Sequence, residues 1–391
     1  MKRVILALVP FAFFWTCTSA EENSRLLVRD SAGITVVESV APAWGEGEGW
    51  TVDLTPLVDL AEAGNGPDYE FFMATDATRL SDGSFVVADD SSDEIRIFSP
   101  TGEFRRTLGR NGSGPGEFQR LDQVFALAGD SILAYDFWES RVTVFDPEGE
   151  MARIVSLDGS QRSRPLFPLV GDGYVGKSTD FEGFGDELGL RRWRHPIVRV
   201  DPRGSVVDTL ATIPGAESVV FSQGDARALW GKNGHLAVRR DEIYLGTADS
   251  VEYEVFGSDG RLQRIVRIPG YDLSLSASEI EGERDAYFPD SLPPNPIFRE
   301  VMDAQPNRDH RPGYADMVID KSGNVWLKAF KGRHEMPEPT NWLVFAATGE
   351  WLGSVVLPPR FEIFRIGPDW ILGKRPDELD VEHIQLLALS R

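Results

Sequence analysis

The hydrophobic and polar positions of the chain repeat one unit, in which an apolar strand leads through a tight turn into a second strand. Five segments share an apolar strand end, three turn-forming residues, a glycine and a polar residue. They are IFSPTGE (97 to 103), VFDPEGE (144 to 150), RVDPRGS (199 to 205), VFGSDGR (255 to 261) and VFAATGE (344 to 350). Glycine at this point supplies the positive φ that a tight hairpin turn requires. The pattern therefore predicts five hairpins.

A second hairpin signal precedes each of these copies, and a sixth follows the last one. The six signals are SDGSFVVAD, GDSILAYD, GDGYVGK, RDEIYLGT, KSGNVWLKA and GPDWILGK. Two hairpins in succession form a four-stranded antiparallel blade, and blades repeated around an axis leave no open sheet edge. The sequence thus predicts an all-β, six-bladed β-propeller. The sixth blade reaches Arg391 without a fourth strand, and we expect the early strand 34–39 to close it.

The passage between the first two blades resembles a known family. The segment GRNGSGPGEF (109 to 118), preceded by FVVADDSSDEIRIFSPTGEFRRTLG, is similar to the repeat of NHL-type propellers. The terminal segments DSAGITVVES and DELDVEHIQLLAL resemble the ends of the secreted bacterial six-bladed propellers of that group. The resemblance spans roughly residues 30 to 391 and is clearest in the first two blades. It implies the fold and export. It does not imply an activity, because a shared fold does not transfer one.

The first twenty residues have the pattern of a secretory signal, with Lys2 and Arg3, an apolar run and a small-residue exit at 16–20. We therefore predict a signal peptide over 1–20 and one propeller domain over 21–391, exported to the periplasm or the cell exterior. Cys17, the single cysteine, is a lipidation candidate, and the alternative is cleavage after Ala20, which would discard it. No later stretch approaches the ~18 apolar residues of a membrane span.

The charge balance excludes one class of partner. The chain has a formal net charge of −22 at pH 7, with 41% hydrophobic and 10% aromatic residues. An acidic surface repels phosphate backbones, so we expect no nucleic-acid partner and no binding to anionic membranes. The aromatic and aliphatic content can build a core without disulfides, and we expect a monomer.

Insertions concentrate on one face of the predicted propeller. The tight turns all belong to one face, whereas the long segments belong to the other: 177–195, 214–234, 269–312 and 331–340. Loops of this length in a compact domain are functional or disordered. We therefore predict that this long-loop face binds a peptide, a glycan or a partner protein.

Two sets of side chains are candidates for ligand contact on that face. The first is basic and aromatic, and the alternative, which the acidic composition favours, is that its arginines pair with neighbouring carboxylates. The second set lies at the ends of the second strands, where polar groups would ring the channel mouth. The predicted ligand-binding residues are Asp89, Asp136, Lys177, Arg192, Trp193, Trp230, Arg311, Lys328, His334 and Lys374.

Sequence motifs for catalysis and metal binding are absent. The five histidines stand in different segments without close spacing, which argues against zinc. The acidic run 89–94 lacks the glycine and terminal glutamate of an EF-type calcium loop, and no G-x-S-x-G or phosphate-loop motif occurs. We therefore expect a non-catalytic binding or scaffolding propeller without a cofactor. The open alternative is a calcium-dependent lyase or lactonase acting at the channel mouth.

Overall fold

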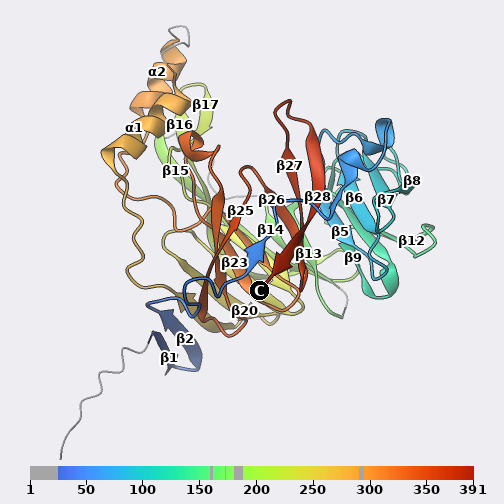
Figure 1. Ribbon diagram of the computed structural model, residues 1–391, viewed down its shortest axis with the longest axis horizontal. Helices are drawn as coiled ribbons and strands as arrows, with labels where there is room; N and C mark the ends of the chain where they lie inside the picture. The colour runs from blue at the N-terminus through green and yellow to red at the C-terminus, as the bar shows by residue number, and fades with distance from the viewer. Residues whose placement is uncertain (1–24, 159–161, 172, 180–187, 290–294) are drawn as a thin grey trace, which may run out of the picture.

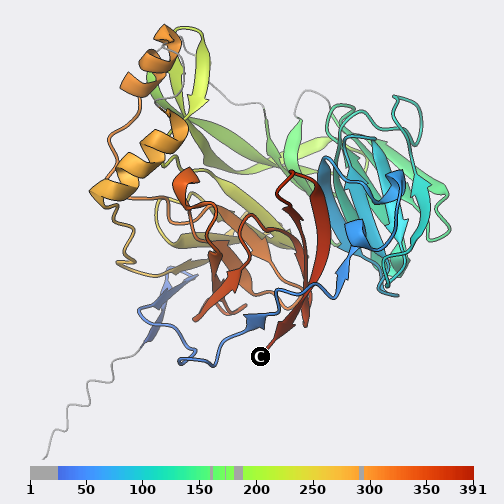
Figure 2. The same ribbon diagram turned by 45° about the horizontal axis from the view of Figure 1, so that its top comes forward.

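The computed structural model describes residues 25–158, 162–171, 173–179, 188–289 and 295–391. The signal peptide and Cys17 lie outside the described residues. The chain folds as a six-bladed β-propeller, as predicted, with six sheets around one axis (Figures 1 and 2). Each sheet begins with an innermost strand and continues outward in sequence order, except that N-terminal strands are added at the outer edges of blades four and six.

Blades one, two and five each contain four antiparallel strands. Blade one consists of β5 (Ala74–Arg79), β6 (Phe85–Asp89), β7 (Glu94–Phe98) and β8 (Phe104–Leu108). Blade two consists of β9 (Leu121–Ala126), β10 (Ile132–Asp136), β11 (Arg141–Phe145) and β12 (Met151–Ser156). Blade five consists of β22 (Asp316–Ile319), β23 (Val325–Lys328), β24 (Thr340–Phe345) and β25 (Trp351–Leu357).

Blades three, four and six carry additional strands. Blade three consists of β13 (Ser163–Pro168), β14 (Tyr174–Ser178), β15 (Gly189–Val200), β16 (Val206–Phe221) and β17 (Gly224–Arg227). Blade four consists of β18 (His235–Arg239), β19 (Glu242–Gly246), β20 (Glu252–Gly257) and β21 (Leu262–Arg267), extended by β2 (Ile34–Ser39) and β1 (Leu26–Ser31). Blade six consists of β26 (Glu362–Ile366), β27 (Trp370–Pro376) and β28 (Glu382–Ser390), with β3 (Thr51–Val52) and β4 (Val58–Asp59) along β28.

The repeat glycines act as the sequence predicts. All five have φ between 76° and 98°, a region that an L side chain rarely adopts: Gly102, Gly149, Gly204, Gly260 and Gly349. The inner strands of a blade are buried from both sides, and β10 and β11 are buried along their full lengths. The outer strand β12 is mostly exposed. Each blade is therefore a sheet between two neighbours.

Six apolar clusters fill the six interfaces between adjacent blades. The cluster between blades one and two joins Val86 and Ile97 to Leu121 and Ile132. The one between blades six and one joins residues of β27 and β28 to residues of β5, β6 and β7. The remaining four clusters join blades two to three, three to four, four to five and five to six. The core is thus a closed ring of packed sheets.

The closing strand is not the predicted one. Segment 34–39 does form a strand, β2, but it pairs in parallel with β21 of blade four, where Glu38 forms an ion pair with Arg267. Blade six is closed instead by β3 and β4, which pair with β28. An N-terminal segment does close the ring, but its strands have two residues each and are too short to give an alternating pattern. Only the tertiary structure shows that segment 34–39 pairs with the edge of blade four and not with the edge of blade six.

The long segments form a cap at one end of the propeller, together with the extended β15–β16 hairpin (Figures 1 and 2). Helix α1 (Ala277–Tyr287) begins at a Ser276–Glu279 capping box, and α2 (Pro296–Asp303) begins at Asn295. Helix α2 is tied to the end of β16 because Ser222 donates to Glu300. Short 3₁₀ turns complete the described elements: η1 (Leu60–Glu62), η2 (Pro67–Tyr69), η3 (Ala128–Asp130) and η4 (Arg333–Glu335). Neither helix has the length and apolar character needed to cross a membrane, within the residues that the structure describes.

Candidate functional site

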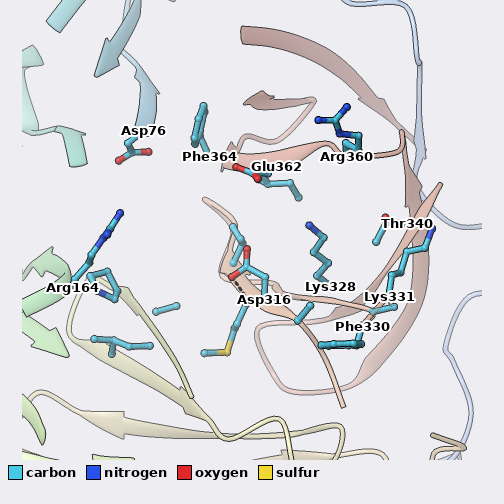
Figure 3. Close-up of a pocket in the computed structure, with 18 of the residues that line it drawn as sticks. Asp76, Arg164, Asp316, Lys328, Phe330, Lys331, Thr340, Arg360, Glu362 and Phe364 are labelled. Atoms are coloured by element: carbon cyan, nitrogen blue, oxygen red, sulfur yellow. Dashed lines mark hydrogen bonds between the residues drawn. The ribbon is translucent and has the colours of Figure 1, made fainter. Parts of the chain in front are cut away.

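A cavity of about 910 Å³ lies in the central channel beneath this cap (Figure 3). The innermost strands of all six blades contribute to its wall, including Asp76 of β5, Arg164 of β13, Asp316 of β22 and Glu362 of β26. Binding sites for drug-sized ligands have about 300–1,000 Å³. The cavity is therefore large enough for a ligand of several residues or sugar rings.

Three of the four long segments supply the rim of the cavity. Trp230 comes from the segment after β17, Tyr287 from α1, and Phe330 and Arg333 from the connection between β23 and β24. The tight-turn face of the propeller supplies none of these rim groups. The insertions and the cavity thus occupy the same end of the channel.

Two ion pairs in the wall are structural. Arg365 binds Asp76 through both terminal nitrogens, at 2.9 and 2.8 Å, and donates a third bond to the Val124 carbonyl. Asp76 also accepts from the Val124 backbone N–H, so this group connects blades six, one and two. Arg164 similarly pairs with the buried Asp122 at 2.8 Å. Because these carboxylates have cationic partners already, they are poor candidates for binding a ligand cation.

Asp316 is differently placed, because no cation neutralises it at close range. It stands opposite Lys328 in the β22–β23 pairing, and its Oδ1 accepts a hydrogen bond from the Met317 backbone at 2.8 Å. About 49% of its side-chain surface is open, but to the confined channel (Figure 3). Burial raises the pKa of the Asp316 carboxyl, and the Lys328 charge opposes this only partly.

His235 lies beside Asp316 but does not form a charged pair with it. Its Nδ1 is 4.0 Å from Asp316 Oδ1. Burial, together with the charges of Lys177, Arg192 and Arg227, lowers the pKa of His235 to about 3. The ring is therefore neutral at physiological pH, and it does not lower the raised pKa of Asp316.

The raised pKa predicts a pH-dependent effect of Asp316→Asn on stability. Below pH ~3 the aspartate is protonated in both the folded and unfolded states, so the stability difference between the two proteins should not change with pH there. As the pH rises, the unfolded aspartate ionises first and ionisation in the folded protein costs free energy. The variant should therefore gain stability relative to the wild type until the folded group has also ionised. Urea unfolding between pH 3.5 and 8 measures this difference, and a constant difference, or a loss that grows with pH, would contradict the assignment.

The predicted residues Trp230, Arg311 and His334 meet at the rim. The Arg311 guanidinium lies 5.4 Å from the centre of the Trp230 ring, and His334 packs edge-on to the same ring at 6.0 Å. Trp230 is buried, lines the cavity and has a φ of 49°, and its indole N–H has no acceptor among the described residues. Phe330 covers it at 5.6 Å. This aromatic group forms one side of the opening.

The wall and rim of the cavity contain cations that form no ion pair with a carboxylate of the described residues. Lys328 lies over the Trp342 ring at 5.9 Å, and Arg333 lies over the Tyr287 ring at 4.4 Å. The guanidinium of Arg227 has no hydrogen bond or ion pair within the described residues. These side chains can therefore offer positive charge to a ligand without breaking an ion pair.

Several other predicted residues have structural partners away from the cavity. Asp89 is fully buried and binds Arg96 at 3.1 Å, and Asp136 caps the backbone N–H groups of Gln119 and Glu139. Lys177 donates to the Gly234 carbonyl, and Lys374 to Glu382 and the Ala74 carbonyl. Of the predicted second-strand ends, the structure places Lys328 in the cavity wall and these four outside it. The two aspartates are buried and the two lysines partly buried, and the hydrogen bonds and ion pairs of all four explain their presence at these positions.

The cap cations largely follow the alternative that the composition favours. Arg192 pairs with Asp249 at 2.9 Å, and Arg311 pairs with Glu279. His334 lies 3.3 Å from Glu283. Trp193, half-buried in β15, does not line the cavity. Charged residues of the cap therefore serve mainly to hold its segments together.

The sequence analysis missed the innermost strands, which supply most of the cavity wall. Asp316, Glu362 and Arg365 all lie within short apolar strands, DMVI and EIFRI. A charged residue inside such a strand could have indicated this. One face of an innermost strand lines the channel and does not pack against a neighbouring blade, so it can carry a charged side chain. Among the residues described, the cavity contains no group of three metal-ligating side chains whose ligand atoms lie within 4.8 Å of one another.

Comparison with known proteins agrees with the architecture. The model of the DUF5128 family, described as a 6-bladed β-propeller, matches residues 72–220. Over its first three blades the chain is similar to this family. No curated protein matches the sequence.

Solved structures resemble the chain over most of its length. One is a Bacteroides fragilis protein described as exported. It is 11% identical, with a TM-score of 0.50, and the match covers 87% of this chain and 95% of that one. A DUF4221 family member from Bacteroides vulgatus is 12% identical, with a TM-score of 0.49 and coverage of 86% and 98%. Virginiamycin B lyase from Staphylococcus aureus is 9% identical, with a TM-score of 0.43 and coverage of 88% and 100%. At these identities the likeness shows the fold alone.

Proposed function

We propose that this protein is an exported, non-catalytic binding propeller whose channel mouth holds a short peptide or a peptide end. The observation that carries the proposal is the cavity of about 910 Å³, which combines charges of both signs with an aromatic opening. Peptides have both an ammonium and a carboxylate group, as well as apolar side chains. The other predicted ligands, a glycan or a larger partner protein, are outcomes that the experiment below distinguishes.

The charge arrangement supports a zwitterionic ligand. Lys328 and Arg227 provide positive charge, whereas Asp316 and Glu362 provide negative charge in the wall, although Glu362 also faces Lys374 at 3.7 Å. In Figure 3 Asp316 and Glu362 lie between Arg164 on one side and Lys328 on the other. In a confined space such charges are screened less than on an open surface, so they discriminate between charged and capped ligand ends.

The aromatic side of the opening supports an apolar contact. Trp230 and Phe330 present ring surface to the cavity, and the unpaired indole N–H of Trp230 can donate to a ligand carbonyl. Rigid aromatic side chains provide contact area at a low entropic cost. A peptide with one apolar side chain would use both properties.

We also propose the cellular setting that the N-terminal sequence predicts. Residues 1–20 would direct export to the periplasm or the cell exterior, either with cleavage after Ala20 or with a lipid anchor at Cys17. The mature chain would then be a monomeric propeller domain over 21–391, of the secreted NHL-like type. Mass determination of the mature N-terminus distinguishes the two forms of processing.

A peptide panel tests the proposal. We expect free tripeptides with one apolar side chain to raise the melting temperature, and their C-amidated forms to bind about tenfold more weakly because they lack the carboxylate that faces Lys328. Lys328→Met should remove this preference, so that free and amidated peptides bind equally. Isothermal titration calorimetry measures both affinities, and neutral oligosaccharides of similar size form the glycan arm.

The matched control is Lys321→Met. Lys321 lies in the turn at the opposite end of the β22–β23 hairpin, where it contacts the Trp370 ring at 5.2 Å and does not line the cavity. It should leave peptide affinity unchanged. The proposal fails if amidation has no effect on the wild type, if the two variants behave alike, or if only the oligosaccharides bind.

The alternative function is a lyase or lactonase at the channel mouth, and the raised pKa of Asp316 is the observation that favours it. Burial raises the pKa of the Asp316 carboxyl, which is the direction that a general acid requires. Turnover of a lactone panel by the wild type, lost in Asp316→Asn and accompanied by one bound calcium per chain, would replace the binding proposal.

A further inference from the structure

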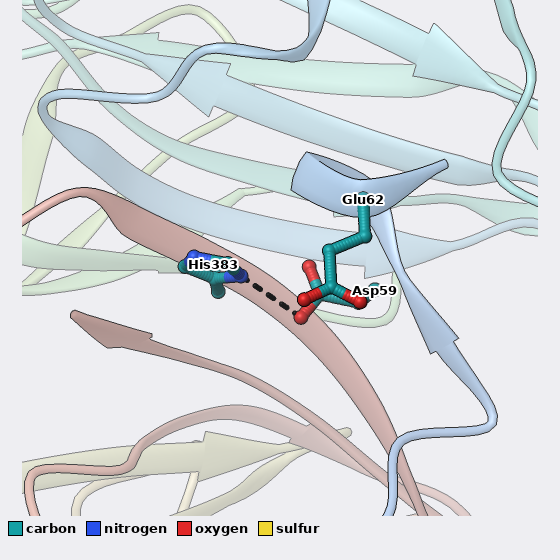
Figure 4. A group of neighbouring side chains, drawn as sticks. All are labelled: Asp59, Glu62 and His383. Atoms are coloured by element: carbon teal, nitrogen blue, oxygen red, sulfur yellow. Dashed lines mark hydrogen bonds and ion pairs between the residues drawn. The ribbon is translucent and has the colours of Figure 1, made fainter. Parts of the chain in front are cut away.

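The ring closure brings together three metal-ligating side chains from distant parts of the sequence. Asp59, Glu62 and His383 each offer one ligand atom, and these atoms lie within 4.8 Å of one another (Figure 4). Asp59 and Glu62 come from the N-terminal segment, and His383 comes from β28, near the C-terminus. We propose that this group is a Zn²⁺ site that fastens the N-terminal segment to the last blade.

Strand pairing fixes the position of two ligands. Asp59 of β4 pairs with Gln385 of β28, and His383 lies on the same face of β28 because it is two residues away. Both side chains therefore reach the same oxygen: His383 Nδ1 is 2.9 Å from Asp59 Oδ2, and Gln385 Nε2 donates to it at 2.7 Å. The carboxylate and the imidazole are thus held before any ion arrives.

The 3₁₀ turn η1 fixes the third ligand. Asp59 caps this turn by accepting from the Ala61 N–H at 3.1 Å, and Glu62 ends the same turn three residues later. Glu62 is exposed, and its carboxylate has no hydrogen bond among the described residues. In Figure 4 it points toward Asp59 from the other side. Its position beside another carboxylate is explained by a shared cation, because two adjacent negative charges otherwise repel.

The donor set fits zinc better than calcium. One imidazole nitrogen and two carboxylate oxygens match the ligands of Zn²⁺, whose bonds of about 2.0–2.2 Å place tetrahedral ligand atoms about 3.3 Å apart. The 2.9 Å between His383 and Asp59 needs only a small adjustment. Calcium prefers six to eight oxygen ligands. A water molecule would complete the tetrahedron.

A neighbouring carboxylate can orient the imidazole. Asp377 Oδ2 is 3.9 Å from His383 Nε2, the nitrogen that Asp59 does not contact. When Nδ1 binds the ion, the ring proton lies on Nε2 and faces Asp377. Partners of this kind commonly orient histidine ligands and strengthen their binding.

The location gives the site a function in stability. The ligands exist together only when β4 and β28 are paired, so the unfolded chain lacks the site. An ion that binds only the folded state raises its stability with concentration. The zinc would therefore reinforce the pairing of β4 with β28, which closes the ring and joins strands that are not consecutive in the sequence.

Zinc titration of the chelator-treated, full chain tests this proposal. Calorimetry should find one Zn²⁺ per chain, and Zn²⁺ should raise the melting temperature by several degrees, whereas Ca²⁺ at the same concentration should not. Glu62→Gln should not lower the metal-free melting temperature, because Glu62 is exposed, makes no hydrogen bond within the described residues, and without a cation only repels Asp59. It should weaken Zn²⁺ by at least about tenfold, since losing even an outer-sphere partner costs about 10–100-fold.

Two further variants complete the design. His383→Gln should abolish Zn²⁺ binding, and His310→Gln, at an exposed histidine outside the site, should leave it unchanged. The proposal is overturned if the wild type binds no Zn²⁺, if Glu62→Gln binds it as tightly as the wild type, or if the ion leaves the melting temperature unchanged. Peptide binding plays no part in these measurements, so this test is independent of the proposed function.

Discussion

Arg365→Met is expected to lower the free energy of unfolding by about 3 kcal/mol. The variant leaves Asp76 only 5% exposed and without its guanidinium, while the methionine keeps an apolar stem near Phe125. Removing one partner of a buried pair costs about 3–5 kcal/mol, and we take the lower end because the Arg365 side chain is 28% exposed. Urea unfolding at pH 7 measures the loss.

An exposed ion pair provides the control. Arg105 and Asp82 lie 3.4 Å apart with about half of each side chain exposed, at 48% and 53%. Arg105→Met should therefore cost about 0.5 kcal/mol. Combining Arg365→Met with Asp76→Asn should recover part of the stability, because no uncompensated charge remains. Equal losses in the two arginine variants would show that the channel pair does not hold the three blades together.

Leu60→Ala is expected to cost about 3–4 kcal/mol, the usual range for truncation of a fully buried leucine. Leu60 is 0% exposed and begins the turn η1, where it packs with Phe71 and Phe98 between blades six and one. The loss would show that the N-terminal segment is part of the closed core. Thermal and urea unfolding both report it.

The same segment contains the control for this prediction. Leu54 is 62% exposed, six residues before Leu60. Leu54→Ala should change stability by less than about 0.5 kcal/mol. If the two alanine variants unfold alike, the segment does not contribute its packing to the stability of the ring.

The sequence predicted the end of the propeller that carries the cavity, but few of the residues that line it. The one-sided insertions indicated the end of the channel where the cavity lies, because a segment that is too long for a turn must fold over a face. Of the predicted residues, Trp230 and Lys328 line the cavity. Asp89 and Asp136 could not be distinguished from Lys328 by pattern, since all three end second strands and only packing determines which side chain faces the channel.

By itself, the sequence determined the six blades and their hairpins, because the alternation of apolar residues and the turn glycines are local properties. It also determined the acidic character of the protein and the face that bears the insertions. Only the tertiary structure decided which segment closes the ring, which charges meet in the channel, and that Asp59 and His383 are neighbours. The Asp59–His383 contact joins residues 324 positions apart and the Asp76–Arg365 pair joins residues 289 positions apart, separations that no local pattern records.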